Sequence, residues 1–116
     1  MTKTEAVSKI QASLLDDPQV ITPKKYTYEA YVKETSSALI ESVIEPTQVQ
    51  VKSACFPEYY LDKYQNASVW AIAQSESSWL LTIEDEMEFA LAFGKDISDI
   101  VMLGFSSSDA LAEWLG

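Results

Sequence analysis

Carboxylates are the densest group of potentially reactive side chains in this chain of 116 residues. Six of them follow one another closely: Glu84, Asp85, Glu86, Glu88, Asp96 and Asp99. Carboxylates can act as acid and base when burial separates their pKa values, can bind a hard cation, or can contact lysine and arginine side chains of another protein. Which of these chemistries is open depends on the fold of the stretch WLLTIEDEMEFALAFGKD, residues 79–96.

The composition excludes most catalytic machinery. The chain has no histidine, and its eight cations are all lysines, so it lacks an imidazole base and an arginine fork for carboxylate or phosphate. Its one cysteine, Cys55, has only Lys52 as a nearby cation, which favours a packed thiol over a reactive one. Three glycines are too few for a glycine-rich phosphate cradle. We therefore expect no enzymatic activity and no cofactor.

The spacing of the acids does not favour a metal site either. The alternating acids and glycine of a calcium loop are missing, and consecutive acids cannot all point at one ion. Two interpretations remain open. The acids are solvated loop residues that keep the protein soluble, or they form a patch that meets a basic protein.

The charge is distributed unevenly along the chain. Residues 1–57 hold seven acids and six lysines, whereas residues 58–116 hold eleven acids and two lysines, so the net charges of −1 and −9 sum to −10. Such a surface repels the phosphates of DNA and RNA, which excludes nucleic acid as an expected partner. Tyr59 and Tyr60 lie in an irregular connector beside charged residues, where they either line a binding surface or cover one end of a sheet.

No apolar run approaches the ~20 residues that a membrane span needs, so we expect no membrane association. The start, MTKTEAVSKI, lacks the apolar stretch of a secretion signal, and one cysteine cannot form an internal disulfide. These features predict a cytoplasmic location. The length is that of one ordinary domain.

The first part of the chain predicts two helices. Thr2 and Glu5 fit a capping box before the apolar positions of a helix at about 4–15. Thr22-Pro23 marks a second start, and Glu45-Pro46 a stop, for a helix at about 26–44. Its apolar stripe is Tyr28, Tyr31, Val32, Thr35, Leu39 and Val43.

After Pro46 the pattern changes to the alternation and short apolar runs of β-strands. Strands are expected at about 48–55, 68–74, 78–83, 87–93 and 99–105, the first of them near a sheet edge. A short terminal helix at about 108–115 follows, with Ser106 and Asp109 as its capping box. The predicted fold class is α+β, an antiparallel sheet of four to five strands with the two N-terminal helices packed on it.

Residues 84–93 allow a helix capped by Thr82 and stopped by Gly94, or the second strand of a hairpin. Met87, Phe89, Leu91 and Phe93 alternate with acids and alanines, whereas on a helix Met87 and Phe89 would face opposite sides. The alternation favours the hairpin, turned at Glu84-Asp85-Glu86. On a helix these acids would complement the dipole of the first turn. At a hairpin tip they have no such internal role.

The sequence therefore predicts a small acidic, non-catalytic protein-binding module. Its most concrete form is an inhibitor or immunity-type protein that covers a basic partner protein through Glu84, Asp85, Glu86, Glu88, Asp96, Asp99, Tyr59 and Tyr60. A self-associating, homodimeric structural or regulatory domain is the alternative, through an edge strand at 48–55 or exposed tyrosines. A small-ligand or metal-binding domain is a further alternative.

Overall fold

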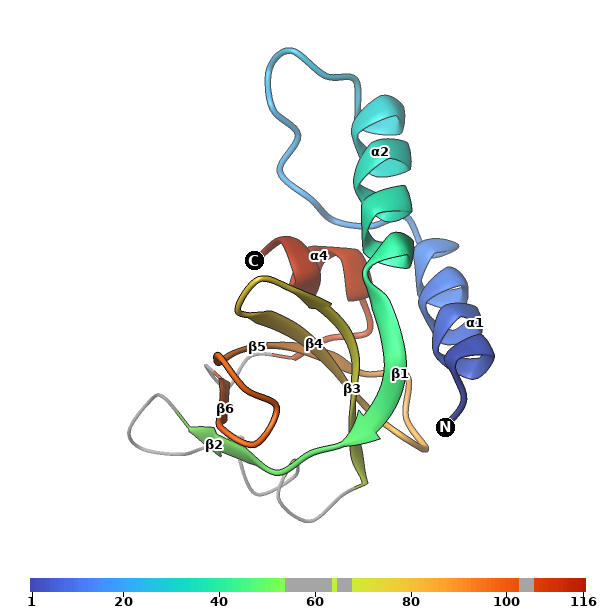
Figure 1. The fold of residues 1–116 in the computed structure, drawn as a ribbon. Helices are drawn as coiled ribbons and strands as arrows, with labels where there is room; N and C mark the ends of the chain where they lie inside the picture. Colours follow the sequence, from blue (N-terminus) through green and yellow to red (C-terminus); the bar gives the residue numbers. More distant parts are fainter. Residues whose placement is uncertain (54–63, 65–67, 103–105) are drawn as a thin grey trace.

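A computed structural model describes residues 1–53, 64, 68–102 and 106–116 of the chain (Figure 1). The helices and strands are, in order, α1 (Lys3–Leu14), α2 (Tyr28–Glu41), β1 (Val43–Gln48), β2 (Val51–Ser53), β3 (Val69–Ser75), β4 (Ser78–Ile83), β5 (Phe89–Phe93), β6 (Ile100–Met102) and α4 (Ala110–Leu115). Two helices thus precede all of the described strands, and a short helix follows them. The α+β class is confirmed.

The described strands form one sheet in the order β1-β3-β4-β5-β6-β2. The five strands from β1 to β6 pair antiparallel, as expected, and β2 adds to the outer side of β6 as a parallel neighbour. β1 and β2 are therefore the two edges of the sheet. The strand predicted at 48–55 was expected near a sheet edge, and its residues contribute to both edges, Gln48 as the last residue of β1 and Val51–Ser53 as β2.

The connection between these edges forces the sheet to curl. Only Val49 and Gln50 separate the end of β1 from the start of β2, and a chain advances at most ~3.6 Å per residue. The two edges, first and sixth in the sheet order, must therefore approach each other at this point. Val49 makes the crossing while its N–H still donates to the carbonyl of Val69 in β3 at 3.0 Å.

The helices cover one face of the curled sheet. Ala6 and Ile10 of α1, Leu39 of α2 and Ala110 and Leu111 of α4 are buried there. They pack against side chains of the four adjacent strands β1, β3, β4 and β5, namely Val43, Ile72, Ala73, Leu80 and Phe89. Ser13 of α1 stabilises this layer, because its buried hydroxyl accepts from Ala110 N at 2.9 Å and donates to Ser108 O at 2.6 Å.

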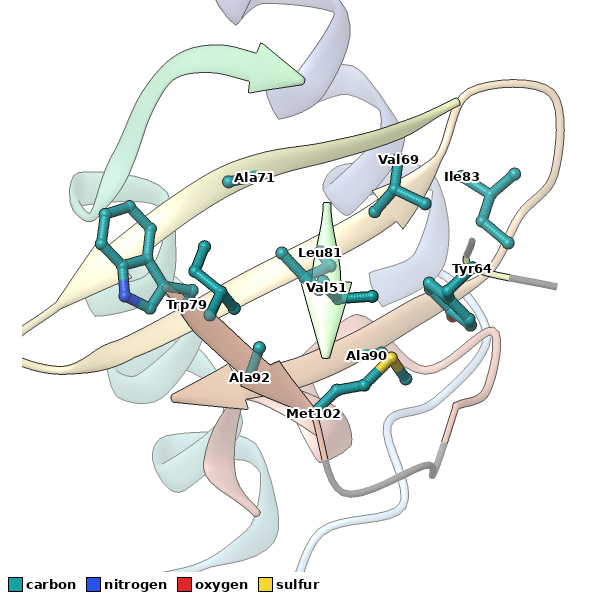
Figure 2. Packing of buried hydrophobic residues seen from close by; sticks show 11 residues of the cluster. Val51, Tyr64, Val69, Ala71, Trp79, Leu81, Ile83, Ala90, Ala92 and Met102 are labelled. Carbon is teal, nitrogen blue, oxygen red and sulfur yellow. The ribbon is translucent and has the colours of Figure 1, made fainter. Parts of the chain in front are cut away.

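The opposite, concave face is covered by the sheet itself (Figure 2). Val51 of β2 lies over Leu81 of β4 in the view, and a common cluster joins them with Val69, Trp79 and Met102. Small residues line the concave side of the central strands: Ala71, Ala90 and Ala92, all fully buried. The small alanine side chains at these positions leave room for β2 on the concave face, as the curl of the sheet requires.

α1 begins as predicted, whereas α2 departs at both ends. Thr2 accepts from Glu5 N at 3.1 Å and donates its own N–H to the Glu5 carboxylate at 3.0 Å, a complete capping box. The N-cap of α2 is Thr27 and not Thr22, because the Thr27 hydroxyl accepts from Ala30 N at 3.2 Å. Residues 23–26 form a turn instead, closed by the Tyr26 N–H on Pro23 O.

The predicted end of this helix at residue 44 is wrong. α2 ends at Glu41 with Ser42 as its C-cap, and Val43 is paired with Ala73 in β1. The β-branched Val43 and Ile44 gain a packing surface on the sheet that a further helical turn would not provide. Pro46 lies inside β1, where an edge strand tolerates its missing N–H.

The single predicted strand at 48–55 is also wrong, since it is divided between β1 and β2 at Val49-Gln50. Val49 and Val51 do share a face, because both pack into the concave cluster. Residues 54 and 55, and therefore Cys55, lie outside the described part of the chain, as do residues 103–105 of the last predicted strand.

Residues 78–93 form the predicted hairpin. Leu80 pairs with Leu91 and Thr82 with Phe89. Thr82 does not cap a helix, because its buried hydroxyl donates across the hairpin to Glu88 O at 2.8 Å. At the C-terminus the N-cap of α4 is Asp109, which accepts from Ala112 N at 3.0 Å, whereas Ser106 bonds elsewhere. The predicted Ser106–Asp109 capping box is therefore absent.

Candidate functional site

The turn between β4 and β5, which we call the acidic turn (residues 84–88), presents three consecutive exposed carboxylates, Glu84, Asp85 and Glu86. Its backbone is held at the start, because Glu84 N donates to Ser68 O at 3.0 Å. Met87 follows with 46% of its surface exposed. The acidic turn thus combines three charges with an exposed apolar side chain on the end of a paired hairpin.

The acidic turn has an internal partner that the sequence did not reveal. Lys9 of α1 extends to the base of the turn, where its ammonium donates to the carbonyl of Ile83 and lies 6.0 Å from the centre of the Phe89 ring. Burial lowers the pKa of Lys9, and the negative charges of Asp85, Glu84 and Glu86 oppose that lowering. One cation therefore offsets part of the charge of three acids.

Glu88 has a different environment from the three acids before it. Its carboxylate is half-buried and accepts from the Ser106 hydroxyl at 2.7 Å. The next residue, Phe89, exchanges two backbone hydrogen bonds with Ser107, at 2.7 and 3.0 Å. Glu88 thus helps to fasten the segment before α4 to β5, and we assign it a structural role.

A second half-buried carboxylate, Glu113, lies on the same segment. The Ser107 hydroxyl donates to Glu113 at 3.1 Å, yet burial raises the pKa of the Glu113 carboxyl. Burial also raises the pKa of the Tyr64 hydroxyl, and the charges of Glu88 and Glu113 add to this effect. Glu88 and Glu113 are thus each bonded to a serine of the segment before α4, which is typical of a structural polar network.

Asp96 and Asp99 lie in the loop at the other end of β5, as the hairpin interpretation expected. Five residues of β5 separate the two ends, or about 16 Å at the rise of a strand. Asp96 accepts from Ser98 N at 3.0 Å and from the Ser98 hydroxyl at 3.1 Å, and these bonds lower its pKa. The predicted acids are therefore divided between the two ends of β5, and only the acidic turn has three consecutive exposed acids.

The predicted tyrosines cannot be placed in this arrangement, since Tyr59 and Tyr60 lie outside the described residues. Tyr64, from the same stretch, is almost fully buried in the concave cluster. A hollow of about 580 Å³ opens beside it, between the β1–β2 connection and the start of β3. Its described lining residues are Gln48, Val49, Gln50, Val51, Tyr64, Ser68 and Val69.

The described side chains offer no arrangement for metal coordination, because no three acids or cysteines among them are grouped closely enough. In the same part of the chain, no helix combines the length and apolarity needed to cross a membrane. Comparisons with protein-family models, with curated proteins and with solved structures find no match to this chain.

Proposed function

We propose that this protein is a non-catalytic binding module that covers a basic protein partner with its acidic turn. The observation that carries the proposal is the row of exposed carboxylates Glu84, Asp85 and Glu86 beside exposed Met87. Carboxylates recognise lysine and arginine side chains, and an apolar neighbour supplies the contact area that charge alone does not. An inhibitor or immunity-type protein that blocks a cationic active site is the most concrete form.

The surrounding structure supports this use of the acidic turn. The two strands that carry it are paired along residues 78–82 and 89–93, and the turn is held at Ser68 and by the Thr82 hydroxyl. A surface that is ordered before binding loses less entropy when the complex forms. Lys9 offsets part of the negative charge at the base of the turn, while Glu84, Asp85 and Glu86 are exposed to solvent.

Long-range electrostatics supports the same function. The net charge of −10 attracts a basic partner and repels nucleic acid, which speeds the correct encounter and suppresses a wrong one. Such steering raises association rates by about 10 to 1,000-fold at low salt and weakens as salt rises. A cytoplasmic location belongs to this proposal, since the chain has a single cysteine and can form no internal disulfide.

The test compares two charge reversals of equal size. A variant with Glu84, Asp85 and Glu86 changed to lysine removes the acidic turn, and a control variant changes Glu34, Glu41 and Glu45, exposed acids of α2 and β1. Proteins captured by the wild-type chain at low salt are purified, and their association rates are measured with all three proteins. We expect the acidic-turn variant to associate at least about tenfold more slowly than the control. Equal rates for the two variants would refute the proposal.

A further inference from the structure

A hollow opens at the same end of the sheet as the acidic turn. Its described lining follows the β1–β2 connection, residues 48–51, and includes Tyr64 and the start of β3 at Ser68 and Val69. Figure 2 shows Tyr64 and Val69 at the same end of the sheet as Ile83, the residue that precedes the acidic turn. The volume of about 580 Å³ lies within the range of about 300–1,000 Å³ that is typical of ligand pockets. The hollow is thus large enough for a side chain of a partner.

Two backbone hydrogen bonds fix the hollow next to the acidic turn. Ser68, which lines the hollow, accepts from Glu84 N at 3.0 Å through its carbonyl. Val49 N donates to Val69 O at 3.0 Å, which holds the β1–β2 connection against β3. Because Ser68 belongs to the hollow and bonds to the acidic turn, one partner can contact both.

The hydroxyl of Tyr64 is a buried polar group at this hollow. Tyr64 is 2% exposed, and its hydroxyl forms no hydrogen bond within the described part of the chain. The neighbouring Ser106 hydroxyl donates its own proton to Glu88. A buried hydroxyl without a partner is unfavourable, so a ligand that forms a hydrogen bond with it gains affinity from a group that the fold leaves unsatisfied.

The charges around this hydroxyl favour a cation. Burial raises the pKa of Tyr64, and the Ser106 hydroxyl opposes part of this rise. The negative charges of three carboxylates raise the pKa further, namely those of Glu88, Glu113 and Glu86. Charges that disfavour a phenolate at this place stabilise a positively charged ligand there.

The rest of the lining combines apolar and neutral polar groups. Three valines of the lining belong to the concave cluster, and two glutamines and a serine supply amide and hydroxyl groups. We propose that the hollow receives a lysine side chain of the basic partner, with the aliphatic stem against the valines and the ammonium at the Tyr64 hydroxyl. A lysine stem packs on apolar surface while its charged end keeps polar neighbours. This inference rests on the proposed function, because it adds a pocket-bound anchor to the contact that the acidic turn makes.

Other occupants fit this lining less well. The planar fork of arginine pairs best with carboxylates, and no carboxylate is among the described lining residues, whereas the three N–H donors of an ammonium suit separate neutral acceptors. An anion would be repelled by Glu86, Glu88 and Glu113. An apolar side chain would leave the Tyr64 hydroxyl unpaired and would remove water from the polar lining.

The first experiment is an NMR titration of the isotope-labelled chain with n-butylammonium, which has the stem and the charge of a lysine side chain. We expect saturable shifts of the Val49, Ser68 and Val69 amide signals, and at least about tenfold weaker binding of n-propylguanidinium and of butyrate. Tyr64→Phe removes only the hydroxyl and should weaken n-butylammonium binding at least about tenfold. Tyr26→Phe, the same change in the loop before α2, is the matched control. Amide signals that do not move with n-butylammonium would overturn the inference.

Thermal melts of the same variants separate a binding role of the hydroxyl from a structural one. A hydroxyl that forms no hydrogen bond does not stabilise the fold, so Tyr64→Phe should melt at the wild-type temperature or above it. A lower melting temperature would mean that the hydroxyl holds the fold, and the inference would be wrong.

The last experiment measures how fast the basic proteins captured by the wild-type chain dissociate. A side chain held in a pocket acts mainly on the dissociation rate, whereas the exposed charges of the acidic turn act mainly on the association rate. We expect the complex of Tyr64→Phe to dissociate at least about tenfold faster than those of wild type and Tyr26→Phe. Equal dissociation rates would overturn the inference and leave the proposed function intact, which is tested separately by the association rate of the acidic-turn variant.

Discussion

The two turns that flank β5 look alike in sequence and differ in structure. Both are short and acidic, one at residues 84–88 and the other at residues 94–99. In the second turn the acids serve the fold, since Asp96 accepts two hydrogen bonds from Ser98 and its carbonyl accepts from Asp99 N at 2.9 Å. In the first turn Glu84, Asp85 and Glu86 are exposed. The local density of charge therefore does not indicate which acids are available to a partner.

Small neighbours make the difference between the two turns. Gly94 lets the chain pass so close to the Asp99 carbonyl that an added Cβ would lie 2.3 Å from its oxygen. The Gly94 carbonyl also accepts from the Trp79 indole at 2.9 Å, and its N–H donates to Ser77 O at 2.9 Å. The acidic turn contains no glycine or serine, so it lacks the residue types that tighten the second turn.

The largest effect on the free energy of unfolding is expected at Gly94, where the second turn is most tightly packed. Gly94→Ala forces a methyl group against the Asp99 backbone, and we expect the free energy of unfolding to fall by about 1–3 kcal/mol. Glu84→Ala, on the exposed turn, should change it by less than about 0.5 kcal/mol. Urea denaturation measures both. If Gly94→Ala proved as harmless as Glu84→Ala, the contrast between the turns would not hold.

A smaller effect on the free energy of unfolding tests whether the contact of Lys9 with the base of the acidic turn stabilises the fold. Lys9→Met keeps the apolar stem of the side chain but removes the ammonium that donates to Ile83 O. We expect a loss of about 1 kcal/mol, because a buried carbonyl loses a charged donor and the three acids lose their nearby cation. Added salt should restore part of the stability by screening the acids. Lys3→Met, exposed on the same helix, is the control, and an equal loss there would assign no special role to Lys9.

The hairpin that separates the two turns could be predicted from the sequence because its signal is local. The alternation from Met87 to Phe93 outweighed the helix propensity of the same residues, and the hairpin is confirmed, although its second strand begins at Phe89 and not at residue 87. The boundary of α2 could not be found in this way. Val43 leaves the helix because of its contact with Ala73, a partner thirty residues away that no local pattern reveals.

The candidate surfaces show the same division. The exposed acids of the first turn were identified from sequence, and so was their position at the opposite end of β5 from Asp96. Lys9 was missed, since its contact with Ile83 joins residues 74 positions apart. The predicted stripe of α2 was only partly correct, since Leu39 is the one buried residue of this helix while Val32 packs against the core from a partly exposed position.

The smallest expected effect is a difference between the two turns in how their acids make stability depend on pH. Hydrogen bonds from Ser98 lower the pKa of the folded Asp96 carboxyl, so its stabilisation is complete above the unfolded value of about 3.9 and is lost as pH falls through the lower folded value. Asp96→Asn should therefore be less stable than wild type at neutral pH, with a difference that disappears in acid. Asp85→Asn should show no such loss at neutral pH, because removing one of three adjacent exposed charges relieves repulsion. Urea midpoints measured from neutral pH downward test both variants. A pH-dependent loss of the same size in Asp85→Asn would mean that the acidic turn, like the second turn, uses its carboxylates to hold the fold.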